Sequence, residues 1–239
     1  MEHLQLLKEI SSEMGFSLSE KQLSQFMLYK DLLLEWNETI NLTAITDQRE
    51  IIIKHFADCI SIGETLPFQE NATLIDVGTG AGFPGVPLKI VFPSLQVTLL
   101  DSLQKRVSFL DELVEKLELD DVSCIHSRAE DGGKNPAYRE QFDYCVSRAV
   151  ANLAVLSEYC LPFVKEGGCF ISLKGPDVEE EVEEAKNAIG ILGGEIIGIT
   201  PVAIPMSDLH HSLVFIKKIG QTPKQYPRKA GKISKNPMK

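Results

Sequence analysis

Hydrophobic residues in the first 66 positions recur at helical spacing. Between Leu23 and Leu34 the apolar positions mostly fall three or four residues apart, which places them on one face of an α-helix. Residues 19–22 and 47–50 have the form of a capping box, in which a small polar side chain and a Glu or Gln three positions later cap a helix start. We therefore predict a helical extension over residues 1–66 whose apolar stripe packs against the next domain.

From residue 72 onward, short apolar runs alternate with longer amphipathic ones. The short runs predict strands at residues 73–77, 96–100, 122–125, 142–147, 168–173, 196–200 and 212–216, and the longer ones predict helices at 104–117, 150–163 and 178–192. Strands that alternate with helices form βαβ units and a buried parallel sheet. The last two strands lie too close together for a helical crossover. The pattern thus predicts an α/β, Rossmann-like domain over residues 67–219, with a seven-stranded, mostly parallel sheet and an antiparallel last strand.

The sharpest local pattern is segment 74–85, Leu-Ile-Asp-Val-Gly-Thr-Gly-Ala-Gly-Phe-Pro-Gly, where a strand runs into a glycine-rich turn that opens a helix. Glycine permits positive φ and lets a ligand approach the backbone closely. The spacing also matches the dinucleotide fingerprint, so a nicotinamide cofactor is one alternative. Asp76 at the strand end favours the other, a nucleoside carrying an amino acid, since a carboxylate attracts its ammonium group and repels a pyrophosphate.

Acidic residues follow the next two predicted strands. Asp101 comes 23 residues after Gly78, where a carboxylate can accept both hydroxyls of a ribose. It could also cap the helix that begins near Leu103. Ala129 and Glu130 lie at the turn that lines the adenine pocket in this fold, and a surface acid is the alternative for Glu130.

Charge is distributed very unevenly along the chain. The net charge is −10, yet residues 217–239 hold eight basic residues and no acidic ones, which leaves 16 basic against 34 acidic residues, or −18, in the remainder. Such a chain can hold a polyanion at its end and repel it elsewhere. A disordered, solubilising tail over residues 220–239 is the alternative. Because no predicted strand lies in residues 222–239, we expect their removal to leave the fold and the cofactor site intact.

Composition narrows the class of protein further. The five cysteines are scattered without a Cys-x-x-Cys pair, which indicates neither a zinc site nor a disulfide framework. No apolar run approaches the roughly 20 residues that cross a bilayer, and the charged first fifteen residues do not form a signal peptide. We expect a reduced, cytoplasmic protein with no membrane partner. Residues 177–184, with six acids in eight positions, are interpreted as a solvated helix face.

Taken in order, segments along nearly the whole chain resemble the bacterial ribosomal RNA small-subunit methyltransferase G family, also called the glucose-inhibited division protein B family. The matching pieces are residues 35–37, 40–45, His55, Asp58, 76–85, 128–130, 147–151, 173–175 and 226–231. The chain departs from the family's proline-rich ending at Ala230 and Ile233.

The resemblance implies a class I methyltransferase that uses S-adenosyl-L-methionine to methylate N7 of guanine 527 in 16S ribosomal RNA, as free RNA or in the small ribosomal subunit. It places Gly78, Phe83, Ala129, Glu130 and Arg148 at cofactor positions, to which the glycine turn and the second strand add Gly80 and Asp101. Guanine N7 has a free lone pair and no proton, so the transfer needs no general base and no metal, only alignment of the reactants.

Basic residues close to the ends of predicted strands are candidates for handling the RNA. We expect Arg148 and Lys174 to act at the reacting centre, and we expect RNA contacts from Arg106, Arg128, Arg228 and Lys229. Surface solubility is the alternative for Arg106. Two other functions stay open at this point: an NAD(P)-dependent oxidoreductase, and a non-catalytic RNA-binding factor of ribosome assembly.

Overall fold

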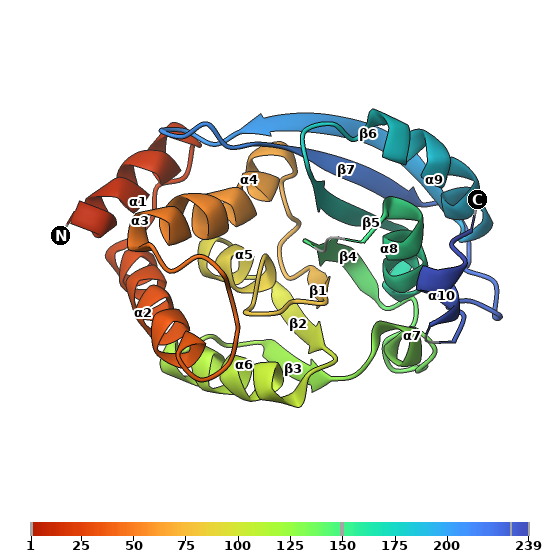
Figure 1. Ribbon diagram of the computed structural model, residues 1–239, viewed down its shortest axis with the longest axis horizontal. Helices are drawn as coiled ribbons and strands as arrows, with labels where there is room; N and C mark the ends of the chain where they lie inside the picture. The colour runs from red at the N-terminus through yellow and green to blue at the C-terminus, as the bar shows by residue number, and fades with distance from the viewer. Residues whose placement is uncertain (1, 149–150, 230, 239) are drawn as a thin grey trace.

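The structure, a computed structural model, describes residues 2–148, 151–229 and 231–238. Within these residues seven strands form one sheet in the order β3-β2-β1-β4-β5-β7-β6 (Figure 1). The strands are β1 (Thr73–Val77), β2 (Gln96–Asp101), β3 (Val122–His126), β4 (Phe142–Ser147), β5 (Val164–Lys174), β6 (Gly194–Ala203) and β7 (His210–Lys218). The five strands from β1 to β5 pair in parallel, and β7 runs antiparallel between β5 and β6. The predicted sheet and its antiparallel last strand are confirmed.

The helices begin and end close to the predicted positions. Before the sheet lie α1 (Glu2–Glu13), α2 (Glu20–Asn37), α3 (Gln48–Ile51), the π-helical turn η1 (Ile52–Ala57) and α4 (Asp58–Thr65); after β1 come α5 (Gly85–Val91), α6 (Gln104–Lys116), α7 (Ala129–Gly132), α8 (Leu153–Cys160), the 3₁₀ turn η2 (Leu161–Phe163), α9 (Glu179–Ile191) and α10 (Lys232–Lys235). Ser19 and Gln22 form the expected capping box, and Asp47 caps α3 through Glu50 N. The helix expected from residue 150 starts outside the described residues; the described part begins with Asn152 as N-cap and becomes a 3₁₀ turn at Pro162, because proline cannot continue the hydrogen-bond ladder.

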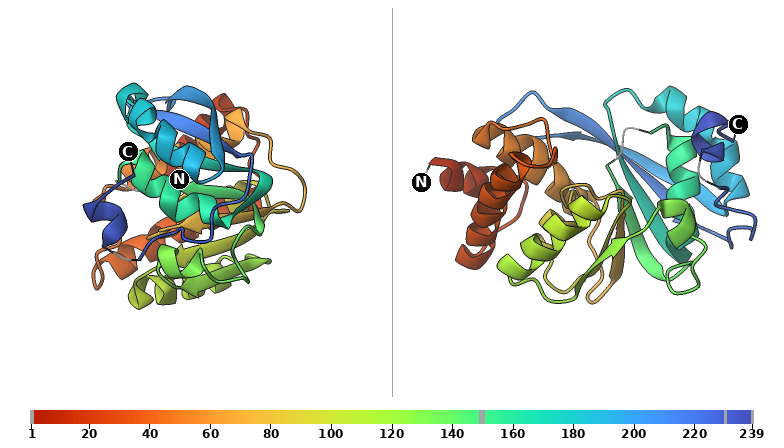
Figure 2. Two further views of the ribbon diagram at one scale, coloured as in Figure 1. Left: turned by 90° about the vertical axis from the view of Figure 1, so that its right-hand side faces the viewer. Right: turned by 60° about the horizontal axis from the view of Figure 1, so that its bottom comes forward.

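Two layers of helices cover the sheet, and alternate residues of each strand point to opposite layers. In β1, Leu74 joins the core beneath α1, α2, α4, α5 and α6, whereas Ile75 joins the core beneath α8 and α9. The same alternation separates Phe215 from Val214 in β7. This period of two is the signature of a sheet that is buried on both faces, and the three layers are visible from the sides in Figure 2.

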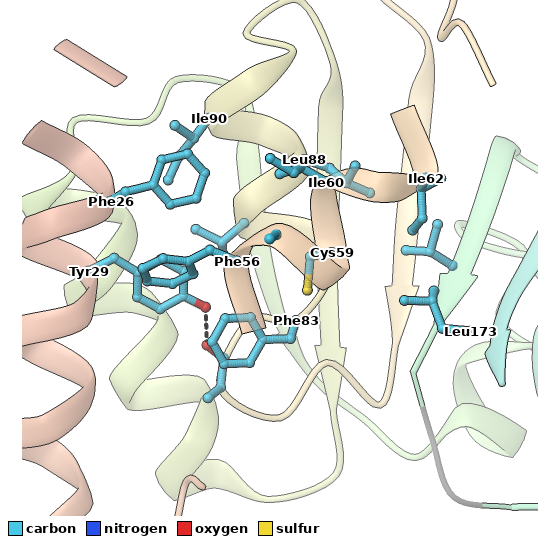
Figure 3. Close-up of a cluster of buried hydrophobic side chains, with 14 of the residues drawn as sticks. Phe26, Tyr29, Phe56, Cys59, Ile60, Ile62, Phe83, Leu88, Ile90 and Leu173 are labelled. Atoms are coloured by element: carbon cyan, nitrogen blue, oxygen red, sulfur yellow. Dashed lines mark hydrogen bonds between the residues drawn. The ribbon is translucent and has the colours of Figure 1, made fainter. Parts of the chain in front are cut away.

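The N-terminal extension shares its core with the sheet. Tyr29 of α2 and Phe56 of η1 are fully buried against Phe83 of the glycine segment, and the Tyr29 hydroxyl donates a 2.5 Å hydrogen bond to Ala81 O (Figure 3). The predicted packing of the apolar stripe against the next domain is therefore what the structure shows. The extension and the sheet bury one continuous apolar core.

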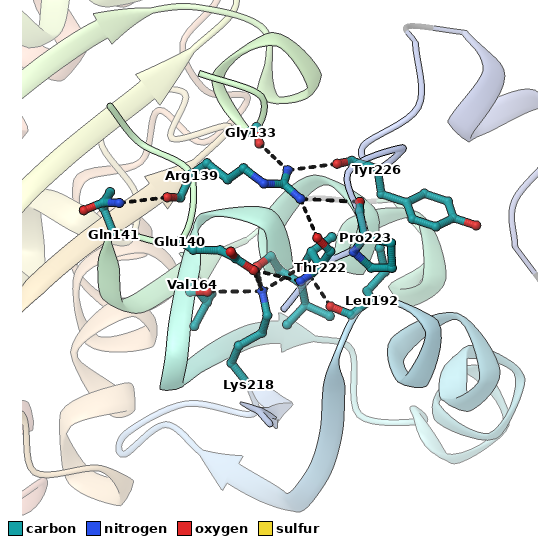
Figure 4. A network of polar contacts seen from close by, with 11 residues as sticks. Gly133, Arg139, Glu140, Gln141, Val164, Leu192, Lys218, Thr222, Pro223 and Tyr226 are labelled. Carbon is teal, nitrogen blue, oxygen red and sulfur yellow. Dashed lines mark hydrogen bonds and ion pairs between the residues drawn. The ribbon is translucent and has the colours of Figure 1, made fainter. Parts of the chain in front are cut away.

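The C-terminal segment is packed on the domain and is not a free tail. Arg139 donates to three backbone carbonyls of this segment, those of Thr222, Pro223 and Tyr226, and buried Lys218 donates to Thr222 Oγ1 (Figure 4). Further along, the Arg228 guanidinium pairs with Glu158, and Ile233 is fully buried. The alternative of a disordered tail does not fit the described residues of this segment, because polar and apolar groups of the domain bind its backbone and side chains.

All five cysteines are free thiols on or beside the sheet. Cys59, Cys145, Cys160 and Cys169 are buried, and Cys124 of edge strand β3 is half-buried. Among the described residues no helix is both long and apolar enough to span a membrane.

Candidate methyl-donor and acceptor site

The glycine turn between β1 and α5 divides its glycines between ligand space and protein packing. Gly78, Gly80 and Gly82 all have positive φ, at 73°, 61° and 97°. A Cβ built at Gly78 or Gly80 meets no protein atom within 4 Å, whereas one at Gly82 comes within 2.8 Å of the Tyr29 hydroxyl. The first two glycines therefore leave open space beside the backbone, and the third lets α2 pack against the turn.

Asp76 holds the glycine turn from beneath. Its Oδ2 accepts hydrogen bonds from Thr79 Oγ1 at 2.7 Å and from Gly85 N at 2.8 Å, and the side chain is fully buried. Oδ1 has no hydrogen-bond partner in the described chain. Burial raises the pKa of this carboxyl to about 7, against the hydrogen bonds from Thr79 and Gly85, which lower it. Asp76 lines neither of the cavities described below, so its expected contact with a ligand's ammonium group stays a prediction.

Asp101 lies at the end of β2, as predicted, and its side chain also stabilises the local backbone. Its Oδ2 accepts from Gly80 N at 2.9 Å, and its Oδ1 accepts from Leu103 N at 2.9 Å. Leu103, not Asp101, is the N-cap residue of α6, so the capping alternative is replaced by an Asx-type turn. Arg106 Nη1 lies 3.5 Å from Asp101 Oδ2. The carboxylate thus ties the glycine turn to the start of α6 at the carboxyl end of β2.

A cavity of about 380 Å³ opens beside the glycine turn. It is lined by Gly78, Ala129 and Glu130 among the predicted residues, together with Val77, Leu100, Ser102, Ser127, Arg128, Ser147, Ala151, Leu156, Tyr159, Gly231 and Ser234. The carboxyl ends of β1, β2 and β4 meet here, the position where ligands bind in open α/β sheets. Glu130 is largely buried, and it lies 3.9 Å from the largely exposed Arg128. The structure therefore brings Gly78, Ala129 and Glu130 together around one cavity.

Phe83 and Arg148 belong to a buried cluster at the junction with the extension. Phe83 stacks between Tyr29 and His55, with ring centroids 5.3 and 4.5 Å away, and the Arg148 guanidinium carbon lies 4.8 Å from the centre of its ring. Arg148 also donates to Asp58 Oδ2 at 2.9 Å and to the Lys54 carbonyl. Phe83 is therefore not among the residues that line the cavity beside the glycine turn, because the extension packs over its ring.

Two acid–base groups of this cluster are strongly shifted. Burial and the Arg148 charge lower the pKa of His55 to about 4, so its imidazole is neutral at physiological pH. Burial alone would raise the pKa of Asp58, but a hydrogen bond from His211 and the Arg148 charge outweigh it and lower that pKa. Asp58 is thus an anion between two cationic or hydrogen-bonding partners.

A second cavity, of about 610 Å³, lies at the carboxyl ends of β4 and β5. It is lined by Asp58, Arg148, Asn152, Leu173, Lys174, Gly175, Asp177, Glu181 and His211. Lys174 Nζ is 2.6 Å from Glu181 and donates to Ala151 O at 2.7 Å. Both residues predicted at the reacting centre, Arg148 and Lys174, therefore line this cavity.

Neighbouring residues at the end of β4 and just before α8 line different cavities. Ser147 and Ala151 line the cavity beside the glycine turn, whereas Arg148 and Asn152 line the second one. Ala149 and Val150, part of the motif noted in the sequence, lie outside the described residues. Two cavities that share one stretch of backbone can hold two reactants next to each other.

Sequence reasoning missed the acidic residues that hold the basic ones. Asp58 was noted only as part of a matching segment, yet it pairs with Arg148, and its Oδ1 lies 2.9 Å from His211 Nδ1. Glu181, interpreted as part of a solvated face, pairs with Lys174. Charge complementarity between Lys174 and the acidic run was the available signal for the second pair, but a residue pattern does not show which of several acids turns inward.

The residues predicted to contact RNA are spread over the surface. Arg128 and Lys229 are exposed, and Arg106 is half-buried beside Asp101. Arg228 donates from Nε and Nη2 to the buried Glu158. Its guanidinium is therefore engaged inside the protein, and an RNA contact from it stays a prediction. Among the described residues no group of three or more His, Cys, Asp or Glu side chains is placed to hold a metal ion.

The strand order, the hairpin of β6 and β7 and the glycine turn at the end of β1 define a class I methyltransferase fold. Two solved structures share this fold. TYW2 of M. jannaschii in complex with AdoMet superposes with a TM-score of 0.51 at 16% identity, covering 64% of this chain and 72% of that one. TrmN from Thermus thermophilus gives 0.53 at 13% identity, over 70% of this chain and 53% of that one. The all-parallel sheet of nicotinamide-binding domains lacks this antiparallel β7, which removes the oxidoreductase alternative.

The chain belongs to the rRNA small subunit methyltransferase G family, whose model matches residues 22–205. Two curated relatives called ribosomal RNA small subunit methyltransferase G illustrate the closeness. The one from Alkaliphilus metalliredigens is 53% identical over 239 residues, all of both chains, and the one from Acetivibrio thermocellus is 56% identical over 233 residues, 98% of this chain and 96% of its own length. This protein is therefore a methyltransferase.

Proposed function

We propose that this protein transfers a methyl group from S-adenosyl-L-methionine to N7 of guanine 527 in 16S ribosomal RNA. The observation that carries the proposal is that the adjacent residues Ser147 and Arg148, at the end of β4, line two different cavities. The donor fits the smaller cavity and the target guanine the larger one. Family membership supports the RNA substrate, since the relatives are rRNA small subunit methyltransferases by name.

The residues around the smaller cavity fit the donor. The open space beside Gly78 and Gly80 is a cradle that any Cβ would partly fill, as a ligand lying against the backbone requires. Ala129 and Glu130 line this cavity and are the groups for the adenine edge. Asp101 at the end of β2 does not line the cavity, and it is the candidate acceptor for ribose hydroxyls because it is tied to the glycine turn through Gly80 N. When bound, the donor supplies an activated methyl group on a sulfonium. Phe83 acts one step removed, by packing the turn against Tyr29 and His55.

The protein's own contribution to the reaction is positioning and charge. Because guanine N7 carries no proton, no residue has to act as a general base. Arg148 and Lys174 present cationic groups in the larger cavity, where they can bind guanine O6 or a flanking phosphate and leave N7 free. Asp58 and Glu181 fix these two cations in place, so they are positioning residues. Holding the two reactants in line in this way can remove a large share of the activation barrier for methyl transfer.

We further propose a division of labour along the chain. Residues 1–66 hold the glycine turn through Tyr29 and hold Arg148 through Asp58, residues 67–219 bind donor and guanine, and residues 220–239 carry surface lysines for the RNA backbone. Arg106, Arg128 and Lys229 are the further candidates for phosphate contacts. We place the reaction on 16S RNA or on the small ribosomal subunit.

The test is to map 7-methylguanine in 16S RNA from cells that lack the protein and from the same cells after restoring it. Loss of the modification at guanine 527, and its return with the wild-type protein but not with the Gly78→Val variant, is the expected result. A purified protein that binds small-subunit particles yet transfers no labelled methyl group to them would instead identify a non-catalytic assembly factor.

A further inference from the structure

We propose that Gly231 and Ser234 of the C-terminal segment form a wall of the donor cavity and that the Arg228–Glu158 pair holds this segment there. This inference rests on the proposed donor site. It makes the segment part of the site for the small molecule, in addition to any contact with RNA.

The lining of the cavity is the first observation. Gly231 and Ser234 line it together with Gly78 and Glu130, although about a hundred or more residues of sequence separate the two groups. Ser234 lies in α10, which is adjacent to α8 (Figure 1). A donor molecule in this cavity would therefore contact the C-terminal segment.

The anchor is the second observation. Glu158 of α8 has a side chain only 1% exposed, and all its hydrogen bonds within the described residues come from Arg228: backbone N to Oε1 at 2.7 Å, Nε to Oε1 at 2.9 Å, and Nη2 to Oε2 at 2.7 Å. A buried carboxylate without a partner is strongly destabilising. The pair therefore stabilises the docked position of the C-terminal segment on α8, because releasing Arg228 would leave Glu158 buried and unpaired.

Helix α8 connects the anchor to the cavity. Leu156 and Tyr159, on either side of this anchor in sequence, line the donor cavity themselves. Beyond the anchor, the buried Ile233 fixes α10, and before it Arg139 grips the backbone at Thr222 and Tyr226. The segment is therefore held at three points along its length, and the cavity wall lies between the second and the third of them and just beyond.

The docked segment also carries exposed positive charges. Lys229, Lys232 and Lys235 are exposed on the same stretch that supplies Gly231 and Ser234 to the cavity. The segment therefore presents cations close to the donor site. Removal of residues 222–239 is expected to impair donor binding as well as RNA binding, which reverses the expectation from the sequence.

The test is calorimetric titration of S-adenosyl-L-methionine and of its demethylated product in the absence of RNA. Arg228→Gln and Ser234→Trp are expected to weaken both ligands about tenfold, the first by releasing the wall and the second by filling cavity space. Lys224→Gln removes the same charge from an exposed position of the segment and is the matched control, with unchanged affinity. Arg228→Lys keeps a cation beside Glu158 and is expected to recover most of the loss.

Ser234→Trp carries the test if Arg228→Gln proves poorly folded, because Ser234 is exposed and its replacement leaves the anchor intact. Wild-type affinity in both variants, with the wild-type protein binding donor normally, would overturn this inference and leave the proposed function standing. A wild-type protein that binds no donor would overturn the proposed function and this inference with it.

Discussion

Gly78 shows how one residue can serve a ligand more than the fold. Its φ of 73° is unfavourable for any residue with a Cβ, and its missing Cβ faces open space in the donor cavity. Gly167, in β5, has a φ of 85° and equally open surroundings, but it does not line the cavity. Comparing substitutions at Gly78 and Gly167 therefore distinguishes the effect of backbone strain from the effect of lost ligand space.

Replacing either glycine by Ala is expected to lower the free energy of unfolding by about 1–2 kcal/mol, the cost of left-handed backbone. Only Gly78→Ala is expected to weaken donor binding, and Gly78→Val is expected to abolish it in a protein that stays folded. Urea unfolding and calorimetry on the variants check both parts. Donor affinity in Gly78→Val within about threefold of wild type would refute the role of the open space.

Asp76 makes the stability of the protein depend on pH. Its pKa of about 7 in the folded protein lies above the ordinary value of 3.8, because burial disfavours the charged form. The folded state therefore binds the proton more tightly, so this contribution to the free energy of unfolding is fully present below about pH 4 and is lost as the pH rises through about 7.

In Asp76→Asn the amide oxygen can still accept from Thr79 and Gly85 without titrating. We expect this variant to lack the part of the pH dependence between about pH 4 and pH 7 that comes from Asp76. Urea unfolding of both proteins across this range is the measurement. Parallel profiles for the two proteins would show that Asp76 is not the titrating group.

At the scale of elements, Asp58 joins three parts of the fold. It lies at the start of α4, pairs with Arg148 after β4, and contacts His211 of β7. Asp58→Ala removes a largely buried carboxylate from the half-buried Arg148 guanidinium and from His211, so we expect it to lower the free energy of unfolding by about 3 kcal/mol, the lower end of the range for a fully buried pair.

Asp31→Ala is the matched control for this element-scale prediction. Asp31 pairs with Lys30, but its side chain is 66% exposed, so its removal should change stability by less than about 1 kcal/mol. Because the pKa of Asp58 is lowered, its contribution to stability is lost only as the pH falls through that low value. Equal effects of the two substitutions would contradict the importance of the buried junction.

The elements themselves were largely readable from the sequence, for a physical reason. Strands such as Phe142–Ser147 are buried on both faces, so most of their residues are apolar and the run stands out in the sequence. Edge strand β6, Gly194–Ala203, is longer than predicted. Exposed residues alternate with more buried ones along it, so no continuous apolar run marks its ends in the sequence. The glycine turn, Asp101 and Glu130 could be predicted because each comes after a predicted strand, so their positions are visible in the order of residues along the chain. Arg148–Asp58, Lys174–Glu181 and Arg228–Glu158 join residues far apart in sequence, and no local pattern encodes such pairs.

At the scale of the whole molecule, the acidic body and the basic segment have opposite effects on RNA. The body carries a net charge of −18 outside residues 217–239, so a polyanion should be repelled from most of the surface. Exposed lysines at positions 229, 232 and 235 are close in sequence to Gly231 and Ser234, which line the donor cavity. RNA should therefore approach the site from this side.

Changing these three lysines together to Gln is expected to weaken RNA binding and to flatten the slope of log affinity against log salt. Each lost phosphate contact removes roughly 0.7–0.9 from that slope. The equivalent triple change at Lys8, Lys21 and Lys116, which are exposed in α1, α2 and α6, removes the same charge and serves as control. Equal slopes for the two triple variants would mean that the segment acts only through net charge.

The reactivity of the five free thiols can report how the protein unfolds. Cys59 and Cys169 lie in the core on one face of the sheet and Cys145 and Cys160 in the core on the other, so an alkylating reagent can reach them only when that face opens. Cys124 on the edge strand should react first. The order in which the remaining four gain mass during labelling then tells whether the two helical layers separate from the sheet together or one after the other.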